Sequence, residues 1–116
     1  MNNRAKGAAY EELAARELEK LGYRILTKNF YCKGGELDIV AMDEGYLCFV
    51  EVKYRASNSE GDPLEAVDHT KVQRICRSAL FYMNRFGYPE DTPVRFDVVS
   101  ILGQEISVYK NAFDYE

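Results

Sequence analysis

The sequence predicts an α/β domain whose elements follow the order α-β-β-β-α-β-β, with a central mixed sheet flanked by helices. Three observations lead to this fold class. Two segments repeat apolar residues at helical spacing, five others are rich in β-branched and aromatic residues, and glycine-containing turns separate most of these five. The chain has 116 residues with no internal repeat or linker, so we expect a single domain over residues 1–116.

The first helix is expected over residues 5–21, where Glu and Lys fill the polar face. Its apolar positions are Ala8, Ala9, Leu13, Ala14, Leu18 and Leu21. Gly22 follows directly, which is typical of a helix end. The second helix is expected to begin at about Leu64 or Asp68 and to end at Phe86, before the sequence Gly87-Tyr88-Pro89.

Five strands are expected around these helices. They cover residues 23–31, 37–42, 46–53, 94–102 and 105–109. Turns are indicated at 34–35, 43–45 and 103–104, and a polar loop at 55–63. The segment from Gly34 to Arg55, with two strands in sequence, carries most of the information about function.

Composition and charge exclude several classes of protein. With 15 Lys and Arg against 19 Asp and Glu, the net charge of -4 argues against coating nucleic acid by bulk charge but leaves room for a local basic site. Three cysteines without a Cys-x-x-Cys pair and a single His do not make a typical zinc site. No apolar run is long enough for a membrane helix or a signal core, so we expect a cytoplasmic protein.

The second and third strands are expected to form a hairpin with Glu44-Gly45 as its loop. In that register Asp38 faces Glu51, and one face of the hairpin carries these carboxylates while the other is apolar core. Two carboxylates opposite each other destabilise a hairpin unless a positive charge lies between them. Carboxylate oxygens suit Mg²⁺, so the register predicts a divalent cation at this pair.

Lys53 points to the same side of the hairpin as Glu51 and could stabilise the charge of a phosphate or orient a water. The alternative is structural. Glu-Val-Lys is typical of any half-exposed strand, Glu36 opposite Lys53 could be a simple ion pair, and a shift of one residue in register would remove the arrangement.

Asp38 together with Glu51-Val52-Lys53 resembles the motif of the PD-(D/E)xK nuclease superfamily, with Leu37 where Pro is usual. The chain is more closely similar to the YraN family, small bacterial proteins predicted to be endonucleases and distantly related to archaeal Holliday junction resolvases. The blocks that carry this resemblance are 34–40, 49–55 and 95–99, supported by 7–11, 21–23 and 110–113.

The resemblance implies a restriction-endonuclease-like fold and a metal-dependent endonuclease that hydrolyses phosphodiester bonds in DNA, including branched or recombination intermediates. It implies Mg²⁺ or Mn²⁺ bound by Asp38, Glu51 and the main-chain carbonyl of Val52. It assigns Lys53 to the attacking water or the charged transition state. It also brings a Glu of the first helix to the metal site, with Glu11 as the matching residue and Glu12 as the competing choice.

The second helix carries Lys71, Arg74 and Arg77 at every third position, which indicates one basic stripe. With His69 and Arg55 nearby in sequence, this stripe is a candidate phosphate-binding edge for DNA. The alternative is a solvated helix face. Lys71 also matches a Lys of the family near the start of this helix.

Two other functions stay open beside the nuclease. One is a catalytically silent nucleic-acid-binding module that keeps the fold, and the other is a protein-interaction domain with a partner in DNA processing, which suits the acidic total charge best. A homodimer, as in resolvases, is a further candidate assembly. Asp97 is expected to be structural, paired with Arg95 or a loop, rather than a metal ligand.

Overall fold

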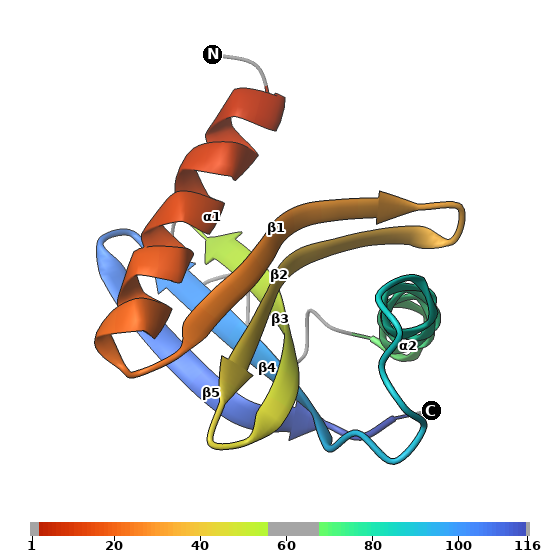
Figure 1. Cartoon of the computed structure of the whole chain (residues 1–116). Coiled ribbons are helices and arrows are strands. Elements are labelled where there is room, and N and C mark those ends of the chain that lie inside the picture. The colour runs from red at the N-terminus through yellow and green to blue at the C-terminus, as the bar shows by residue number, and fades with distance from the viewer. Residues whose placement is uncertain (1–2, 56–67, 116) are drawn as a thin grey trace.

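The computed structural model describes residues 3–55 and 68–115. Its elements follow the predicted order, which confirms the fold class (Figure 1). They are α1 (Asn3–Lys20), β1 (Arg24–Cys32), β2 (Gly35–Asp43), β3 (Tyr46–Arg55), α2 (His69–Arg85), β4 (Val94–Leu102) and β5 (Glu105–Phe113). A five-stranded mixed sheet with two helices in this order is consistent with a restriction-endonuclease-like fold.

The five strands lie in the sheet in chain order, from β1 to β5. All neighbours are antiparallel except β3 and β4, which are parallel because α2 lies between them in the chain. Helix α2 begins where Asp68 caps it, since the Asp68 carboxylate accepts a hydrogen bond from the Lys71 amide (2.9 Å). Of the two predicted starts, Asp68 directly precedes α2, and Leu64 lies outside the described residues.

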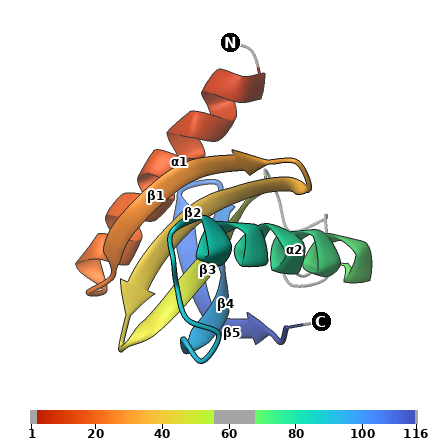
Figure 2. The ribbon, with the colours of Figure 1, turned by 45° about the vertical axis from the view of Figure 1, so that its right-hand side comes forward.

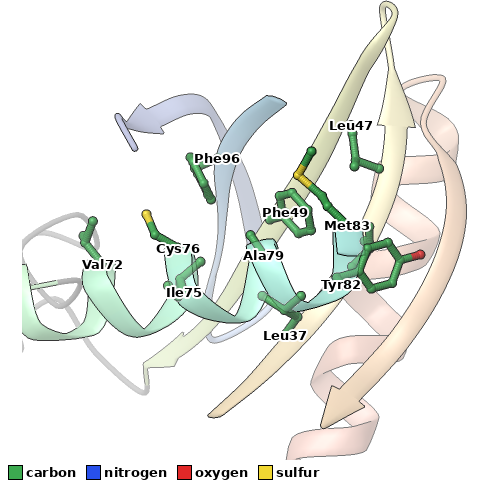
Figure 3. Close-up of a cluster of buried hydrophobic side chains, with 11 residues drawn as sticks. Leu37, Leu47, Phe49, Val72, Ile75, Cys76, Ala79, Tyr82, Met83 and Phe96 are labelled. Atoms are coloured by element: carbon green, nitrogen blue, oxygen red, sulfur yellow. The ribbon is translucent and has the colours of Figure 1, made fainter. Parts of the chain in front are cut away.

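Each face of the sheet is covered by one helix, so both faces are core (Figure 2). On one face α1 packs with Leu18 over Ile39 and Val50. On the other, α2 directs its apolar side chains at Phe49 and Phe96 (Figure 3). The face of the β2–β3 hairpin that was predicted to be core is buried under α1 at Ile39, Ala41, Cys48 and Val50, and the opposite face is buried as well, at Val40 and Phe49.

The hairpin register is the predicted one where the ladder exists, from Ile39–Val50 to Asp43–Tyr46. Leu37 departs from the expected alternation, because it belongs to the cluster under α2 while Ile39 lies on the α1 side. Strand β2 bends beyond Ile39 and continues in its pairing with β1. Among the described residues the β2–β3 ladder does not reach Asp38 and Glu51.

Neither described helix combines the length and apolar character that crossing a membrane requires.

Candidate active site

Asp38 and Glu51 lie where β2 and β3 separate, and both carboxylates are buried. In place of the next ladder bond, the Val52 amide donates a hydrogen bond to Asp38 Oδ2 (2.8 Å). The amide and carbonyl of one residue in a strand point to the same neighbour. The Val52 carbonyl therefore faces the gap in which the two carboxylates lie.

Helix α1 brings Glu11 to these carboxylates. A pocket of about 230 Å³ is lined by Glu11, Glu36, Asp38 and Glu51 together with residues of α1, β3 and α2. Glu12 points elsewhere and pairs with Lys28 at 2.7 Å, on the exposed surface. The structure thus places Glu11, and not Glu12, beside Asp38 and Glu51.

Asn29 is a site residue that the sequence analysis missed. It has a left-handed backbone (φ 58°) in the middle of β1, which Asn adopts more readily than most residues. Its side chain hydrogen-bonds Glu11. An Asn inside an otherwise apolar and basic strand was the signal that could have identified it.

The positively charged side chains at the site contact Glu51 rather than Asp38. Lys71 Nζ lies 2.8 Å from Glu51 Oε1, and Lys53 Nζ lies 3.7 Å from the same oxygen. The predicted pairing of Lys53 with Glu36 is replaced by this contact. Lys71, expected on a phosphate-binding edge, instead reaches from α2 into the carboxylate group.

The pKa values record this uneven distribution of charge. Burial and the adjacent Glu51 raise the pKa of the Asp38 carboxyl to about 8, and the Val52 amide only partly offsets them. Burial also raises the pKa of Glu11, with Glu36 and Glu51 adding to the effect. Burial and the neighbouring Lys71 lower the pKa of Lys53, although Glu51 opposes them. The site therefore holds more negative charge than its two lysines neutralise.

These residues fit a divalent cation only in part as they stand. Within residues 3–55 and 68–115, no three His, Cys, Asp or Glu side chains converge closely enough to hold a metal ion alone. Two carboxylates with a main-chain carbonyl, however, match the partial protein shell that Mg²⁺ takes, the rest being water and substrate phosphate. Glu11 Oε2 is buried without a hydrogen-bond partner in the described chain, which leaves one oxygen for a cation or its water.

The remaining predicted phosphate-binding residues differ in their surroundings. Arg74 is exposed and lines a pocket of about 240 Å³ with Lys71 and Glu51, and Arg77 is exposed further along α2. Arg55 is buried, with its side chain only 7% exposed. It lies at the end of β3 beside Leu102 and not on an exposed edge. His69 is exposed at the first turn of α2.

A second group of buried charges lies at the C-terminal end of β2 and has a structural character. Arg95 donates hydrogen bonds to both oxygens of Asp97 (2.9 Å each) and to Asp43 (2.7 Å). The Tyr23 hydroxyl donates to Asp97 (2.6 Å), and Lys110 lies 3.0 Å from Asp43. The pairing of Asp97 with Arg95 was predicted and is confirmed.

Comparison with known proteins gives a consistent family. Residues 10–101 match the model described as uncharacterised protein family UPF0102. A UPF0102 protein of Lachnoclostridium phytofermentans is 48% identical over 98% of this chain and 97% of its own length. Those of Persephonella marina and Aliivibrio salmonicida are 41% and 45% identical over 96% of this chain, and over 95% and 93% of their own lengths. The chain therefore belongs to the UPF0102 family, which is the YraN family that its sequence blocks resemble.

Proposed function

We propose that this chain is a metal-dependent endonuclease that hydrolyses phosphodiester bonds in DNA. The observation that carries the proposal is the buried group of carboxylates at the point where β2 and β3 separate, which is short of positive charge. Holding Asp38, Glu51 and Glu11 together costs folding stability, and local costs of this kind are typical of functional sites. The resemblance to predicted endonucleases supports the same conclusion.

Mg²⁺ or Mn²⁺ would be held by Asp38, Glu51 and the carbonyl of Val52, with Glu11 close enough to bind through a water. The raised pKa of Asp38 supports this assignment, since a cation beside that carboxyl would favour its ionised form. When bound, the ion would lower the pKa of its water and polarise a phosphoryl oxygen.

The two lysines have different roles in this proposal. Lys53 projects into the pocket from the same strand as Glu51, and its lowered pKa lets it exchange a proton with a water more easily than an exposed lysine. We assign it to orienting the attacking water and stabilising the negative charge that develops. Lys71 compensates Glu51 in the free protein and, once a cation takes that place, is free to contact the substrate phosphate.

The test is cleavage of branched, nicked and single-stranded DNA in the presence of Mg²⁺ or Mn²⁺. Asp38→Asn and Lys53→Ala should each lower the cleavage rate by about 100-fold or more, since each removes a group placed at the reacting atoms. Glu12→Gln is the matched control for Glu11→Gln, because its carboxylate is one residue away but points to the surface. Cleavage of no substrate, or cleavage by Asp38→Asn at the parent rate, would overturn the proposal.

The ion pair between Lys71 and Glu51 favours a second candidate, a catalytically silent module that binds nucleic acid. In this candidate the Lys71 ammonium stays paired with Glu51 and takes the place of the metal ion. This candidate predicts salt-sensitive DNA binding that weakens in Arg74→Ala and Arg77→Ala and is unchanged in Asp38→Asn. A protein-interaction domain, the third candidate, predicts no binding when DNA is titrated at low salt.

A further inference from the structure

Beyond the carboxylate site, α2 concentrates positive charge. Its 17 residues contain Lys71, Arg74, Arg77 and Arg85 and no Asp or Glu. The whole chain has a net charge of -4, so the rest of the chain carries -8 against +4 on this helix. An acidic protein with one wholly cationic helix directs polyanions to that helix.

One flank of α2 carries a stripe of side chains that is interrupted in its middle at Ser78, which is fully buried. Lys71, Arg74, Ser78, Phe81 and Arg85 recur at intervals of three or four residues, so they lie one above the other along the helix. The stripe spans 15 residues, 71–85, and its ends lie about 21 Å apart along the helix axis. It starts in the candidate active site, where Lys71 contacts Glu51, and continues away from it.

The outer end of the β1–β2 hairpin lies along the same flank (Figure 2), and two pockets lie between them, which together are called the groove below. Cys32 Sγ is 3.5 Å from Ser78 Oγ, and a Cβ at Gly35 would lie 3.4 Å from that oxygen. This contact separates the pocket that contains Arg74 and Glu51 from a second pocket of about 500 Å³. The second pocket is lined by Phe30, Tyr31, Cys32, Phe81, Asn84 and Arg85.

The second pocket presents aromatic rings to solvent. Tyr31 is 63% exposed and Phe81 52% exposed, and neither ring stacks on another ring within the described residues. Phe30 is held beneath them by edge contacts with Tyr82 and Phe86. Arg85, whose guanidinium lies 5.7 Å from the Phe86 ring, is the pocket's one charged side chain. Exposed rings beside arginines are what single-stranded nucleic acid binds, since every unpaired base offers a face for stacking.

We infer that the groove between α2 and the end of the β1–β2 hairpin binds a single-stranded segment of DNA, with unpaired bases stacked on Tyr31 and Phe81 and phosphates at Arg74 and Arg85. This inference rests on the proposed function in taking DNA as the ligand, and it specifies the substrate class. The substrate is DNA that carries unpaired nucleotides close to the bond that is cut. Bases within a duplex cannot stack on these rings, because their faces are already covered.

The first test measures binding of a labelled oligothymidylate to the full chain by fluorescence anisotropy, in EDTA and at low salt so that nothing is cut. Tyr31→Ala and Phe81→Ala should each weaken binding about tenfold, and binding of a duplex of equal length should change less than twofold. Tyr31→Phe should bind as the parent does. Tyr115→Ala is the control, because Tyr115 is 56% exposed but lines a different pocket on the opposite flank of α2.

Two comparisons distinguish stacking from other contacts. Phe81→Leu keeps apolar surface but removes the ring, so it should bind single strands as weakly as Phe81→Ala. An oligonucleotide with abasic sites should bind the parent about tenfold more weakly, and Tyr31→Ala should not weaken it further. Full affinity of Phe81→Leu, or equal affinity for the abasic strand, would overturn stacking. Absence of single-strand binding at low salt would also overturn the inference and leave a protein as the occupant of the groove.

The same variants separate this inference from the nuclease proposal. Asp38→Asn should abolish cleavage and leave binding of the single strand unchanged. If single strands bind through Tyr31 and Phe81 but no DNA is cut with Mn²⁺, the nuclease proposal fails and the groove stands. If DNA is cut and the aromatic variants bind and cut as the parent does, the inference about the groove fails and the nuclease proposal stands.

Discussion

Strand β2 carries two buried aspartates, Asp38 near its middle and Asp43 at its last residue, and the two have opposite electrostatic character. Burial alone would raise the pKa of Asp43, but Arg95 and Lys110 outweigh it and hold that pKa below its usual range. Asp38 lies deeper in the protein, and its pKa rises to about 8, because burial is the largest effect on it and its charged neighbours Glu51 and Glu11 add to that effect. The nearby lysines pair with Glu51 instead.

The difference shows what separates a structural carboxylate from a candidate functional one in this fold. At the Asp43 end the chain supplies its own cations and uses them to join β2, β4 and β5. Around Asp38 it leaves negative charge without enough compensation, in a pocket that opens to solvent. Replacing residues in the first group should destabilise the protein, and replacing acidic residues in the second should stabilise it.

The largest effect is expected from Arg95→Met. This change leaves Asp97, which is fully buried, and Asp43 without their main cation. Removing one partner of a buried ion pair costs about 3–5 kcal/mol, so the free energy of unfolding should fall by that amount in urea denaturation. Arg16→Met is the control, since its pair with Glu12 is exposed and worth well under about 1 kcal/mol. Equal effects of the two substitutions would contradict a structural role for the Arg95 group.

Asp38→Asn should have the opposite sign. A pKa raised from 3.8 to about 8 corresponds to roughly 6 kcal/mol of unfavourable free energy at high pH, as an upper bound. Relaxation around the buried charge reduces this, and we expect the metal-free variant to be about 1–3 kcal/mol more stable than the parent at pH 8. Thermal or urea unfolding in EDTA measures it. A variant that is less stable than the parent at pH 8 would contradict the charge imbalance.

The pH dependence of the unfolding free energy gives a second measure of whether the charge on Asp38 destabilises the protein. The folded state binds the Asp38 proton more tightly than the unfolded state does. Protonation of Asp38 therefore contributes to the free energy of unfolding, and this contribution is fully present below about pH 4. It is lost as the pH rises from about 4 to about 8 and stays lost above that. Asp38→Asn should flatten the loss, and Mn²⁺ should stabilise the parent at pH 8 but not the variant. The Asp43 group acts in a separate window, because its stability is lost only as the pH falls below about 4.

Much of the fold could be predicted because it depends on local signals. Helical spacing, β-branched runs and glycine turns identify each element, and the two-residue turn at Glu44-Gly45 sets the hairpin register that the structure has. What could not be predicted is where that register ends. The bend of β2 beyond Ile39 depends on packing against β1 and α2, which lie far away in the sequence.

The residues of the candidate site could be chosen from the sequence only in part, and their function stays a prediction. The types and order of Asp38, Glu51 and Lys53 pointed to it, and the pairing of Asp97 with Arg95 was expected from their spacing. The contact of Lys71 with Glu51 and the burial of Arg55 depend on how α2 and β4 lie against β3, which spacing within one element does not contain. For the same reason helical periodicity alone could not decide between Glu11 and Glu12.

Lys71→Met and Lys53→Met should separate the two lysines at the site. Lys71 forms the shorter pair with Glu51, and although burial opposes it, Glu51 raises the pKa of Lys71. Losing that pair should cost about 1 kcal/mol of unfolding free energy. Lys53→Met should lower the unfolding free energy by less than this, because the pKa of Lys53 is lowered in the folded protein. The two variants are compared by urea denaturation at pH 7, and a larger loss in Lys53→Met would mean that the wrong lysine has been taken as the partner of Glu51.

The smallest effects should come from the two adjacent glutamates of α1, and they should differ in sign. Glu11→Gln removes a carboxylate whose pKa burial has raised, so the metal-free protein should become slightly more stable at pH 8. Glu12→Gln removes the exposed pair with Lys28 and should cost about 0.5 kcal/mol or less. Because both residues occupy the same helix and lose the same charge, net charge and helix propensity cancel between them. A difference in unfolding free energy can then come only from which group each carboxylate faces, and the same sign in both variants would mean that Glu11 does not share the charge excess at Asp38.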